Sequence, residues 1–391
     1  MQESNGMFQL PEELQMLRDV VRKFVEHEVV PLEPSMDFDQ YELPPEEAAG
    51  LRKKAREMGL WCMGAPKEYG GQGLSTLGLA VVSEEAAKHR NGAYNPALGA
   101  FGTEPPAPLY GGTQEQIERY VVPVIEGTKR CFFALTEPSG GSDPARAVRT
   151  TAVKKGDRWI LNGRKMFISH AADADFGLVV ARSGEGRTGL TSFIVERDSP
   201  GLTMTRIPVI RPMYPYELLL EDVEVPEENV INAQGRGFAV AQERLVRTRV
   251  PYAAGCVGIG QKALEMAIEY ARDRVTFGEP LANRQAVQWM IVDSEIELRS
   301  ARWLTWEAAI KCDRHEPART EVSIAKLVST ETAGRVVDRA IQVFGGMGVT
   351  RELPFERWYR ELRIKRIGEG PSEVHRHVIA RDLFHPERRL A

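Results

Sequence analysis

The apolar positions in the first third of the chain repeat at the spacing of an amphipathic helix. After Pro11, a suitable first helical residue, apolar side chains recur every three or four positions until Pro31 ends the pattern. Similar periodicity predicts helices over residues 46–58, 74–88 and 114–122, separated by breaks rich in proline and glycine. We therefore expect residues 1–130 to form an all-helical domain.

From about Cys131 the pattern changes to short runs that are typical of β-strands. Residues 158–161 and 164–169 flank Asn162-Gly163, a dipeptide that favours a type I′ turn, so this segment predicts a β-hairpin. Further strands are predicted over 176–181, 191–196, 202–207 and 218–225, because these runs are apolar or β-branched and turn residues separate them. We expect residues 131–236 to form a small, β-barrel-like domain.

Helical periodicity returns beyond Gly237. It predicts helices over residues 240–274, 286–311, 321–344 and 372–384, and long helices of this kind favour a four-helix bundle over residues 237–391. The predicted fold class is therefore mostly α, with an N-terminal helical domain, a middle β-domain and a C-terminal four-helix bundle.

Composition excludes several classes of protein. The 391 residues, 42% apolar and 27% charged, suffice for more than one packed domain, and the net charge of -4 gives no basic excess for nucleic acid. The four cysteines lie far apart in the sequence and form no CxxC pair, which disfavours both a zinc cluster and a set of disulfides. Free cysteines are typical of a reducing compartment, so we expect the protein in the cytoplasm. Because the N-terminus lacks a signal-peptide pattern and no run of about 18 apolar residues occurs, we expect neither export nor a membrane span.

Residues 131–145, CFFALTEPSGGSDPA, form the first candidate site. Gly140 and Gly141 allow backbone N–H groups to approach a diphosphate or a flavin closely, with the hydroxyls of Thr136 and Ser142 as hydrogen-bond partners. A tight turn at the entry to a domain is the commoner reason for a Gly-Gly loop.

Two further motifs end long predicted helices. Arg274, in RVTFG, is either a phosphate clamp or a cation that the helix dipole favours in the last turn. The stretch QVFGGMG at residues 342–348 has more glycines than one helix end requires, which suggests backbone packed against something flat.

The stretch IGEGPSEVH at residues 367–375 places Glu369 between two glycines just before a predicted helix. The helix dipole alone favours a solvated carboxylate there. His375 and His377 point to different faces of that helix, so we predict no metal site and expect histidines at the surface or in a subunit contact.

The motifs TEPSGGSD, RVTFG and QVFGGMG and the EG pair after Ile367, in this order around a β-rich middle, resemble the acyl-CoA dehydrogenase family over essentially the whole chain. The resemblance implies an FAD-dependent enzyme that dehydrogenates an acyl-CoA thioester and passes electrons to an electron-transfer flavoprotein. It also implies a homo-oligomer, usually a dimer of dimers. An oxidase that uses O2 and a flavoprotein scaffold with little turnover are the alternatives.

The resemblance also implies roles for residues. Glu369 stands where most of these enzymes carry the catalytic base, whereas Thr248, at the other position used in the family, cannot serve as a carboxylate. The implied substrate contacts are Ser142, Val246, Arg249, Gly368, Glu369 and Gly370. The implied FAD contacts are Phe133, Leu135, Thr136, Gly141, Ser142, Phe167, Ile168, Ser169, Arg274, Thr276, Phe277, Gln285, Gln342, Val343, Gly345, Gly346, Gly370, Ser372 and Glu373. Of these, Arg274, Thr276, Gln285 and residues 342–346 are implied to come from a neighbouring subunit.

The chain departs from the family pattern at several positions. Gly368 replaces a large aromatic residue common before the base, which suggests a wider pocket and a branched, cyclic or bulky short-to-medium acyl group. Pro371 removes a threonine hydroxyl near FAD, and Phe167 replaces a tryptophan common at the flavin edge. Residues 211–216 lack the Gly-x-Arg-x-Ser pattern that usually precedes the last strand.

Overall fold

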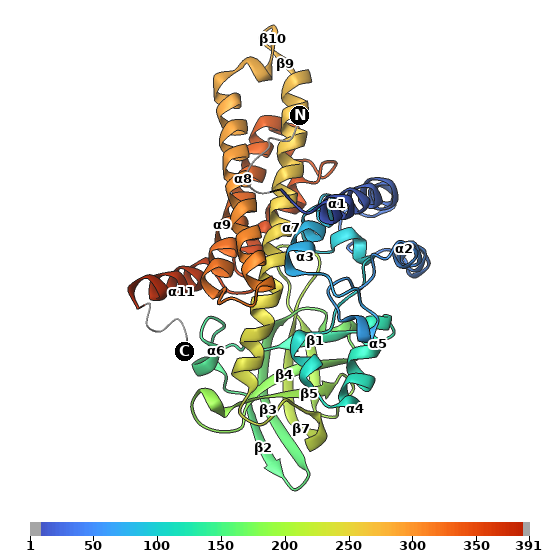
Figure 1. The fold of residues 1–391 in the computed structure, drawn as a ribbon, viewed down its shortest axis with the longest axis vertical. Coiled ribbons are helices and arrows are strands. Elements are labelled where there is room, and N and C mark those ends of the chain that lie inside the picture. The colour runs from blue at the N-terminus through green and yellow to red at the C-terminus, as the bar shows by residue number, and fades with distance from the viewer. Residues whose placement is uncertain (1–8, 386–391) are drawn as a thin grey trace.

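The computed structural model describes residues 9–385, without the side chains of Pro144, Arg187, Glu243, Arg244, Val246 and Arg247. Long helices form a bundle that fills the upper part of Figure 1, and a curved sheet lies below this bundle. The N-terminal helices α1, α2 and α3 lie at the side of the bundle. The predicted class, mostly α with a β-rich middle, is confirmed.

The N-terminal region is helical, as predicted. It contains α1 (Glu12–Phe24), α2 (Pro45–Glu57), α3 (Thr76–Ala86), α4 (Gln114–Gln116) and α5 (Val122–Glu126). A hydroxyl caps two of these helices: Ser75 accepts from the N–H of Gly78 at the start of α3, and Thr113 forms a capping box with Gln116 at the start of α4. Helix α3 is apolar on most sides because it packs between other helices, in contact with α1, α7 and α8.

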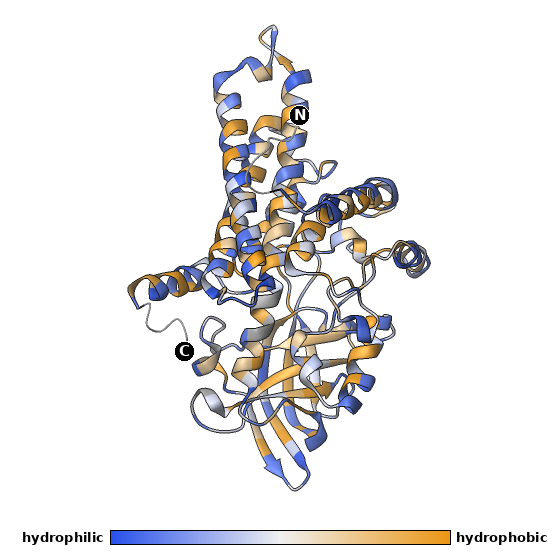
Figure 2. Ribbon diagram, in the orientation of Figure 1, coloured by the Kyte–Doolittle hydropathy of each residue, from blue (hydrophilic) through white to orange (hydrophobic). Residues whose placement is uncertain are grey.

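The middle of the chain forms one eight-stranded sheet. Its strands are β1 (Cys131–Ala134), β2 (Thr151–Lys155), β3 (Arg158–Ile168), β4 (Phe176–Arg182), β5 (Leu190–Glu196), β6 (Leu202–Arg206), β7 (Tyr216–Pro226) and β8 (Val230–Ile231), and a short helix, α6 (Pro144–Ala147), follows β1. The order is β6-β7-β3-β2-β4-β5-β8, with β1 parallel to β4. Strands β4 and β5 are buried along almost their whole length, and Figure 2 shows apolar residues in the middle of the sheet and hydrophilic ones toward the lower ends of its strands.

The predicted hairpin turn at Asn162-Gly163 is wrong. Strand β3 runs without a break from Arg158 to Ile168, and the hairpin closes earlier, at Gly156 between β2 and β3. The Asn-Gly pair marks an irregularity in the pairing of β3 with β7, where Asn162 exchanges two hydrogen bonds with Asp222, at 2.8 and 2.9 Å. Two neighbouring strands therefore override the local turn preference.

The C-terminal region holds α7 (Gly237–Asp273), α8 (Gln285–Asp313), α9 (Arg319–Phe344), α10 (Phe355–Lys365) and α11 (Ser372–Phe384), and β9 (Val275–Thr276) with β10 (Glu279–Pro280) forms a small hairpin at the tip. All four predicted helices are present. Sequence periodicity missed α10, whose Phe355, Trp358 and Leu362 lie in the core shared by α7, α8 and α9. Helix α10 is therefore the fourth helix of the bundle core. Helix α11 runs outward from the bundle (Figure 1).

None of the helices in the described part of the chain combines the length and the apolar character that crossing a membrane requires.

Candidate active site

Glu369 lies in the loop between α10 and α11 and has a left-handed backbone conformation, with φ of 56°. This conformation costs a non-glycine residue about 1–3 kcal/mol. Two cations hold it: Arg249 Nε donates to the carbonyl oxygen of Glu369 at 2.9 Å, and Lys326 Nζ donates to that of Gly370 at 2.7 Å. Lys326 also donates to the carbonyl of Arg366, at 3.3 Å, so one buried lysine from α9 connects the end of α10 to the loop.

The Glu369 side chain is partly buried and contacts α7. Its Oε2 accepts a hydrogen bond from the Thr248 hydroxyl at 3.2 Å. Thr248 cannot itself serve as the base, but its hydroxyl orients the Glu369 carboxylate. Val246, another predicted substrate contact on α7, lies among the side chains that the structure does not describe.

Tyr252 of α7 partly fills the space beside Gly368. A Cβ atom at residue 368 would lie 3.0 Å from the Tyr252 hydroxyl oxygen. An aromatic side chain at residue 368 would therefore need Tyr252 to move. The pocket near the base is shaped by both residues, and the glycine alone does not set its width.

The expectation that His375 lies at the surface or in a subunit contact is wrong. Its side chain is fully buried beneath the loop, with Nε2 3.2 Å from where a Cβ of Gly370 would lie. Burial and, to a smaller extent, the charges of Arg249 and Lys326 lower the pKa of His375 to about 3, so the ring is neutral at pH 7. His377 is exposed, as expected. Among the described residues no three His, Cys, Asp or Glu side chains lie close enough together to bind a metal ion.

The loop after β1 carries Leu135, Thr136, Gly141 and Ser142, and it lies beside the end of β3. The N–H of Met166 donates to the carbonyl of Thr136 at 2.8 Å, which brings the loop next to residues 167–169. Phe167, in a left-handed conformation with φ of 59°, is 56% exposed, whereas Ile168 is buried. The structure therefore brings together the predicted FAD contacts of the loop and those that follow Met166.

A buried ion pair that sequence reasoning missed anchors this loop. Lys165 Nζ lies 2.7 Å from Glu137 Oε1, and both side chains are almost completely buried. Glu137 also accepts from the N–H groups of Arg149 and Thr150 at 2.6 and 3.0 Å. Burial alone would raise the pKa of Glu137, but the Lys165 charge and these hydrogen bonds hold it below its usual value. Burial lowers the pKa of Lys165 to about 8.

Gly370, Ser372 and Glu373 lie in the Glu369 loop and at the start of α11, whereas the remaining predicted FAD contacts lie at the opposite end of the bundle. Arg274 ends α7, Gln285 begins α8, and residues 342–346 end α9, all near the tip that β9 and β10 form in Figure 1. Phe277 is 98% exposed, and a Cβ at Gly345 or Gly346 would meet no atom within 4 Å. Because these residues lie far from the β1 loop, one chain does not bring the two sets together.

A buried polar network joins all three regions and gives a structural role to the unusual segment 211–216. Arg211 Nη1 lies 2.7 Å from Glu361 Oε2 of α10, and the Tyr41 hydroxyl donates to Glu361 Oε1 at 2.6 Å. The Arg211 guanidinium also lies 4.3 Å from the ring centroid of Tyr94, whose hydroxyl is 2.7 Å from His170 Nε2. Sequence alone held no signal for this network, since its members are up to 320 positions apart.

Comparisons with known proteins agree along the whole chain. Residues 11–128, 132–223 and 235–384 match the families described as acyl-CoA dehydrogenase N-terminal, middle and C-terminal domains. The chain is 37% identical over 387 residues to the short-chain specific acyl-CoA dehydrogenase of Rattus norvegicus mitochondria, covering 97% of this chain and 92% of the relative.

Two solved structures resemble the fold over nearly its full length. Butyryl-CoA dehydrogenase from Megasphaera elsdenii has a TM-score of 0.86 and 32% identity, covering 97% of this chain and 100% of that one. An FAD complex of PigA has a TM-score of 0.88 and 26% identity, covering 97% of this chain and 99% of that one.

Proposed function

The chain belongs to the acyl-CoA dehydrogenase family of FAD-dependent oxidoreductases, and from this premise we propose that it removes the α and β hydrogens of a short-to-medium acyl-CoA with a branched, cyclic or bulky acyl group. The observation that carries the proposal is the Glu369 carboxylate, held in a strained loop by Arg249 and aimed by Thr248. Strained backbone that the surrounding structure holds in place is typical of active sites.

The residues present fit FAD. The Gly-rich loop at residues 139–142, the exposed Phe167 ring and the open backbone of Gly345 and Gly346 offer close approach to a large planar ligand. Residues 133–142 and 167–169 would hold the flavin of their own subunit, and Arg274, Gln285 and residues 342–346 the FAD of a neighbour. When bound, FAD supplies a two-electron acceptor for the hydride that leaves the β-carbon.

Glu369 performs the acid–base step in this proposal. Its carboxylate takes the α-proton of the thioester, while the Thr248 hydroxyl holds Oε2 in place. The N–H of Glu369 donates to the thioester carbonyl and stabilises the negative charge that develops on its oxygen. The two hydrogen bonds from Arg249 and Lys326 to the loop carbonyls keep this N–H and the carboxylate in fixed relation.

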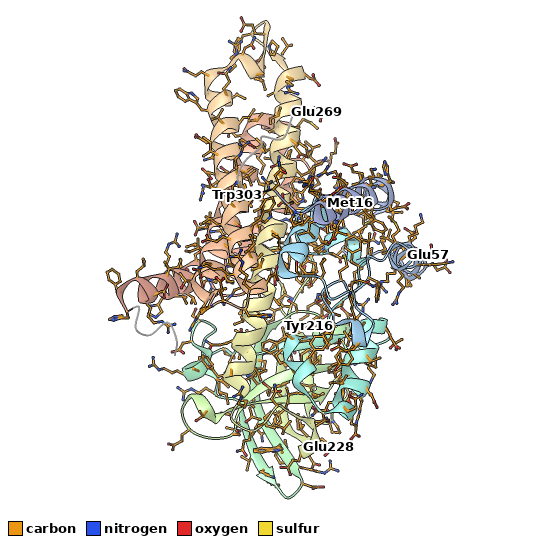
Figure 3. The ribbon with its side chains drawn as sticks, viewed as in Figure 1. Met16, Glu57, Tyr216, Glu228, Glu269 and Trp303 are labelled. Atoms are coloured by element: carbon orange, nitrogen blue, oxygen red, sulfur yellow. The ribbon has the colours of Figure 1, made fainter. Side chains whose placement is uncertain are left out.

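The proposed function requires a homo-oligomer, because the two sets of FAD contacts lie at opposite ends of one chain. Helix α8 has an exposed apolar stripe at helical spacing, formed by Trp289, Val292, Ile296 and Trp303, which are 44–60% exposed. Trp303 is labelled on this helix in Figure 3. A stripe of this kind fits burial against a second copy, and in the family assembly is a dimer of dimers.

An anaerobic bleaching assay tests the function. The purified holoenzyme should lose its flavin absorbance when mixed with a suitable branched or cyclic acyl-CoA, and Glu369→Gln should bind the thioester but bleach about 10²–10⁴-fold more slowly. Glu352→Gln, an exposed carboxylate before α10, is the matched control and should bleach at the wild-type rate. Wild-type bleaching by Glu369→Gln would remove the base from the mechanism and favour a scaffold role.

The electron acceptor is proposed to be an electron-transfer flavoprotein. An oxidase that uses O2 is the alternative, and the two are separated by measuring hydrogen peroxide in air without an added acceptor. A preference for straight over branched chains of equal carbon count would overturn the proposed acyl group and leave the enzyme class in place.

A further inference from the structure

His375 is a buried polar side chain that the proposed function does not use. It lies in the first turn of α11, beneath the loop that carries Glu369, and is 0% exposed. Its Nε2 atom lies 3.2 Å, and its Cε1 atom 3.7 Å, from the position that a Cβ of Gly370 would take. The ring therefore contacts the underside of the loop, and the lack of a side chain at Gly370 permits this close approach.

Neither nitrogen of this ring is satisfied. Among the described residues, no group lies in hydrogen-bonding geometry with Nδ1 or Nε2 of His375. Buried polar groups in proteins almost always have a hydrogen-bond partner, and one without a partner costs free energy that an apolar side chain would avoid. Packing alone therefore does not explain a histidine here, since methionine or leucine would fill a similar space without this cost.

The surroundings keep the ring neutral and leave it one N–H group. Burial, followed by the charges of Arg249 on α7 and Lys326 on α9, lowers the pKa of His375 to about 3. The backbone of Gly370 and Glu369 opposes this lowering, as carbonyl acceptors close to a ring N–H do. A neutral imidazole has one donor and one acceptor nitrogen. With the proton on Nε2, the donor lies on the side of Gly370.

The loop above the ring is strained and needs support. Glu369 has φ of 56°, and backbone in this region keeps its conformation only while the surrounding structure holds it. Arg249 donates to the carbonyl of Glu369 and Lys326 to that of Gly370, and both side chains reach the loop from other helices. A carbonyl oxygen has two lone pairs, so that of Gly370 can accept from His375 as well as from Lys326.

We propose that His375 is a positioning residue for the base: its Nε2–H donates to the carbonyl of Gly370 when the loop moves toward α11, and this limits the movement of the Glu369 carboxylate. The inference rests on the proposed function, because that function makes Glu369 the base. The position of the carboxylate affects the rate of proton transfer strongly, since a displacement of about 1 Å costs up to about 100-fold in rate. Thioester binding should change much less, because it draws on contacts along the whole ligand.

Stopped-flow bleaching without oxygen separates the rate of the chemical step from binding. The holoenzyme is mixed with isobutyryl-CoA or butyryl-CoA, which have equal carbon counts and differ in branching. His375→Met fills the space without a donor, so the limiting bleaching rate should fall about tenfold, the size expected of one lost hydrogen bond, while the thioester Kd changes by less than about threefold. His375→Gln keeps a donor and should bring the rate back to within about threefold of wild type.

His377→Met controls for the substitution itself. It replaces the same type of residue on the same helix at an exposed position, and it should leave the bleaching rate and the Kd unchanged. The flavin content and the urea midpoint of each variant report folding. Because His375→Met removes an unsatisfied buried group, its urea midpoint should not fall.

The outcomes separate this inference from the proposed function. A wild-type bleaching rate in His375→Met, or a rate in His375→Gln no higher than in His375→Met, overturns the donor role. A lower urea midpoint with equal losses of rate and affinity indicates packing alone and also overturns it. If no acyl-CoA bleaches the wild-type flavin, the proposed function fails, and hydrogen exchange of residues 366–371 then tests His375. Exchange there should be faster in His375→Met than in wild type and His375→Gln, and equal exchange refutes the role.

Discussion

Replacing Lys165 by methionine tests whether the buried ion pair holds the loop that is proposed to contact FAD. The Lys165 and Glu137 side chains are 0% and 3% exposed, and their 2.7 Å contact is supported by two N–H donors to Glu137. Breaking a buried pair from one side costs about 3–5 kcal/mol. Because the N–H groups of Arg149 and Thr150 remain, we expect the lower end, about 3 kcal/mol, which is a large part of a typical stability of about 5–15 kcal/mol.

The pH dependence has a definite sign. The pKa of Glu137 in the folded protein is lowered from 4.5, so its stabilising contribution is present above pH 4.5 and is lost as the pH falls through the folded-state value. In Lys165→Met only the N–H groups of Arg149 and Thr150 still oppose the burial that raises this pKa, so the pKa of Glu137 rises relative to wild type and its protonation relieves the unpaired charge. The difference in unfolding free energy between wild type and variant should therefore shrink as the pH falls from 7 to 5.

Urea unfolding followed by circular dichroism measures the loss, and flavin fluorescence measures the release of FAD, which should accelerate in the variant. Lys165→Met/Glu137→Gln should recover at least half of the lost stability, because a glutamine accepts the same N–H groups without a charge. Lys155→Met, at an exposed lysine of β2, is the control. A loss below about 1 kcal/mol, with no gain in the double variant, would refute the reasoning.

Three further results are expected. Arg211→Met leaves Glu361 buried with only Tyr41 and should lower the free energy of unfolding by about 3–5 kcal/mol; an unchanged urea midpoint would show that the network contributes nothing. Lys326→Met should slow bleaching more than it weakens thioester binding. Since the pKa of Lys326 is lowered from 10.5 to about 8, wild type should also gain stability between pH 8 and 10.5, a gain that the variant should lack when titrated in parallel. Trp303→Glu should shift the oligomer to a smaller species in light scattering, and an unchanged mass would place the subunit contact elsewhere.

The sequence determined the helices at both ends of the chain, most of the strands and the position of Glu369. Helical periodicity is a local property, so α7, α8 and α9 were predicted to within a few residues. Helix α10 was missed because it is short and mostly charged. Its Phe355, Trp358 and Leu362 are recognised as core residues only when they are seen packed inside the bundle. The Asn162-Gly163 turn was mispredicted because pairing with β7 outweighed a two-residue preference.

Only the tertiary structure decided which polar side chains are buried and what they contact. The sequence predicted that His375 lies at the surface or in a subunit contact, yet its side chain is buried under the base. Arg211 forms an ion pair with Glu361, which lies 150 positions later in the sequence. The physical reason is that helix and strand patterns come from neighbours along the chain, whereas burial, charge pairing and pKa come from elements that folding brings together.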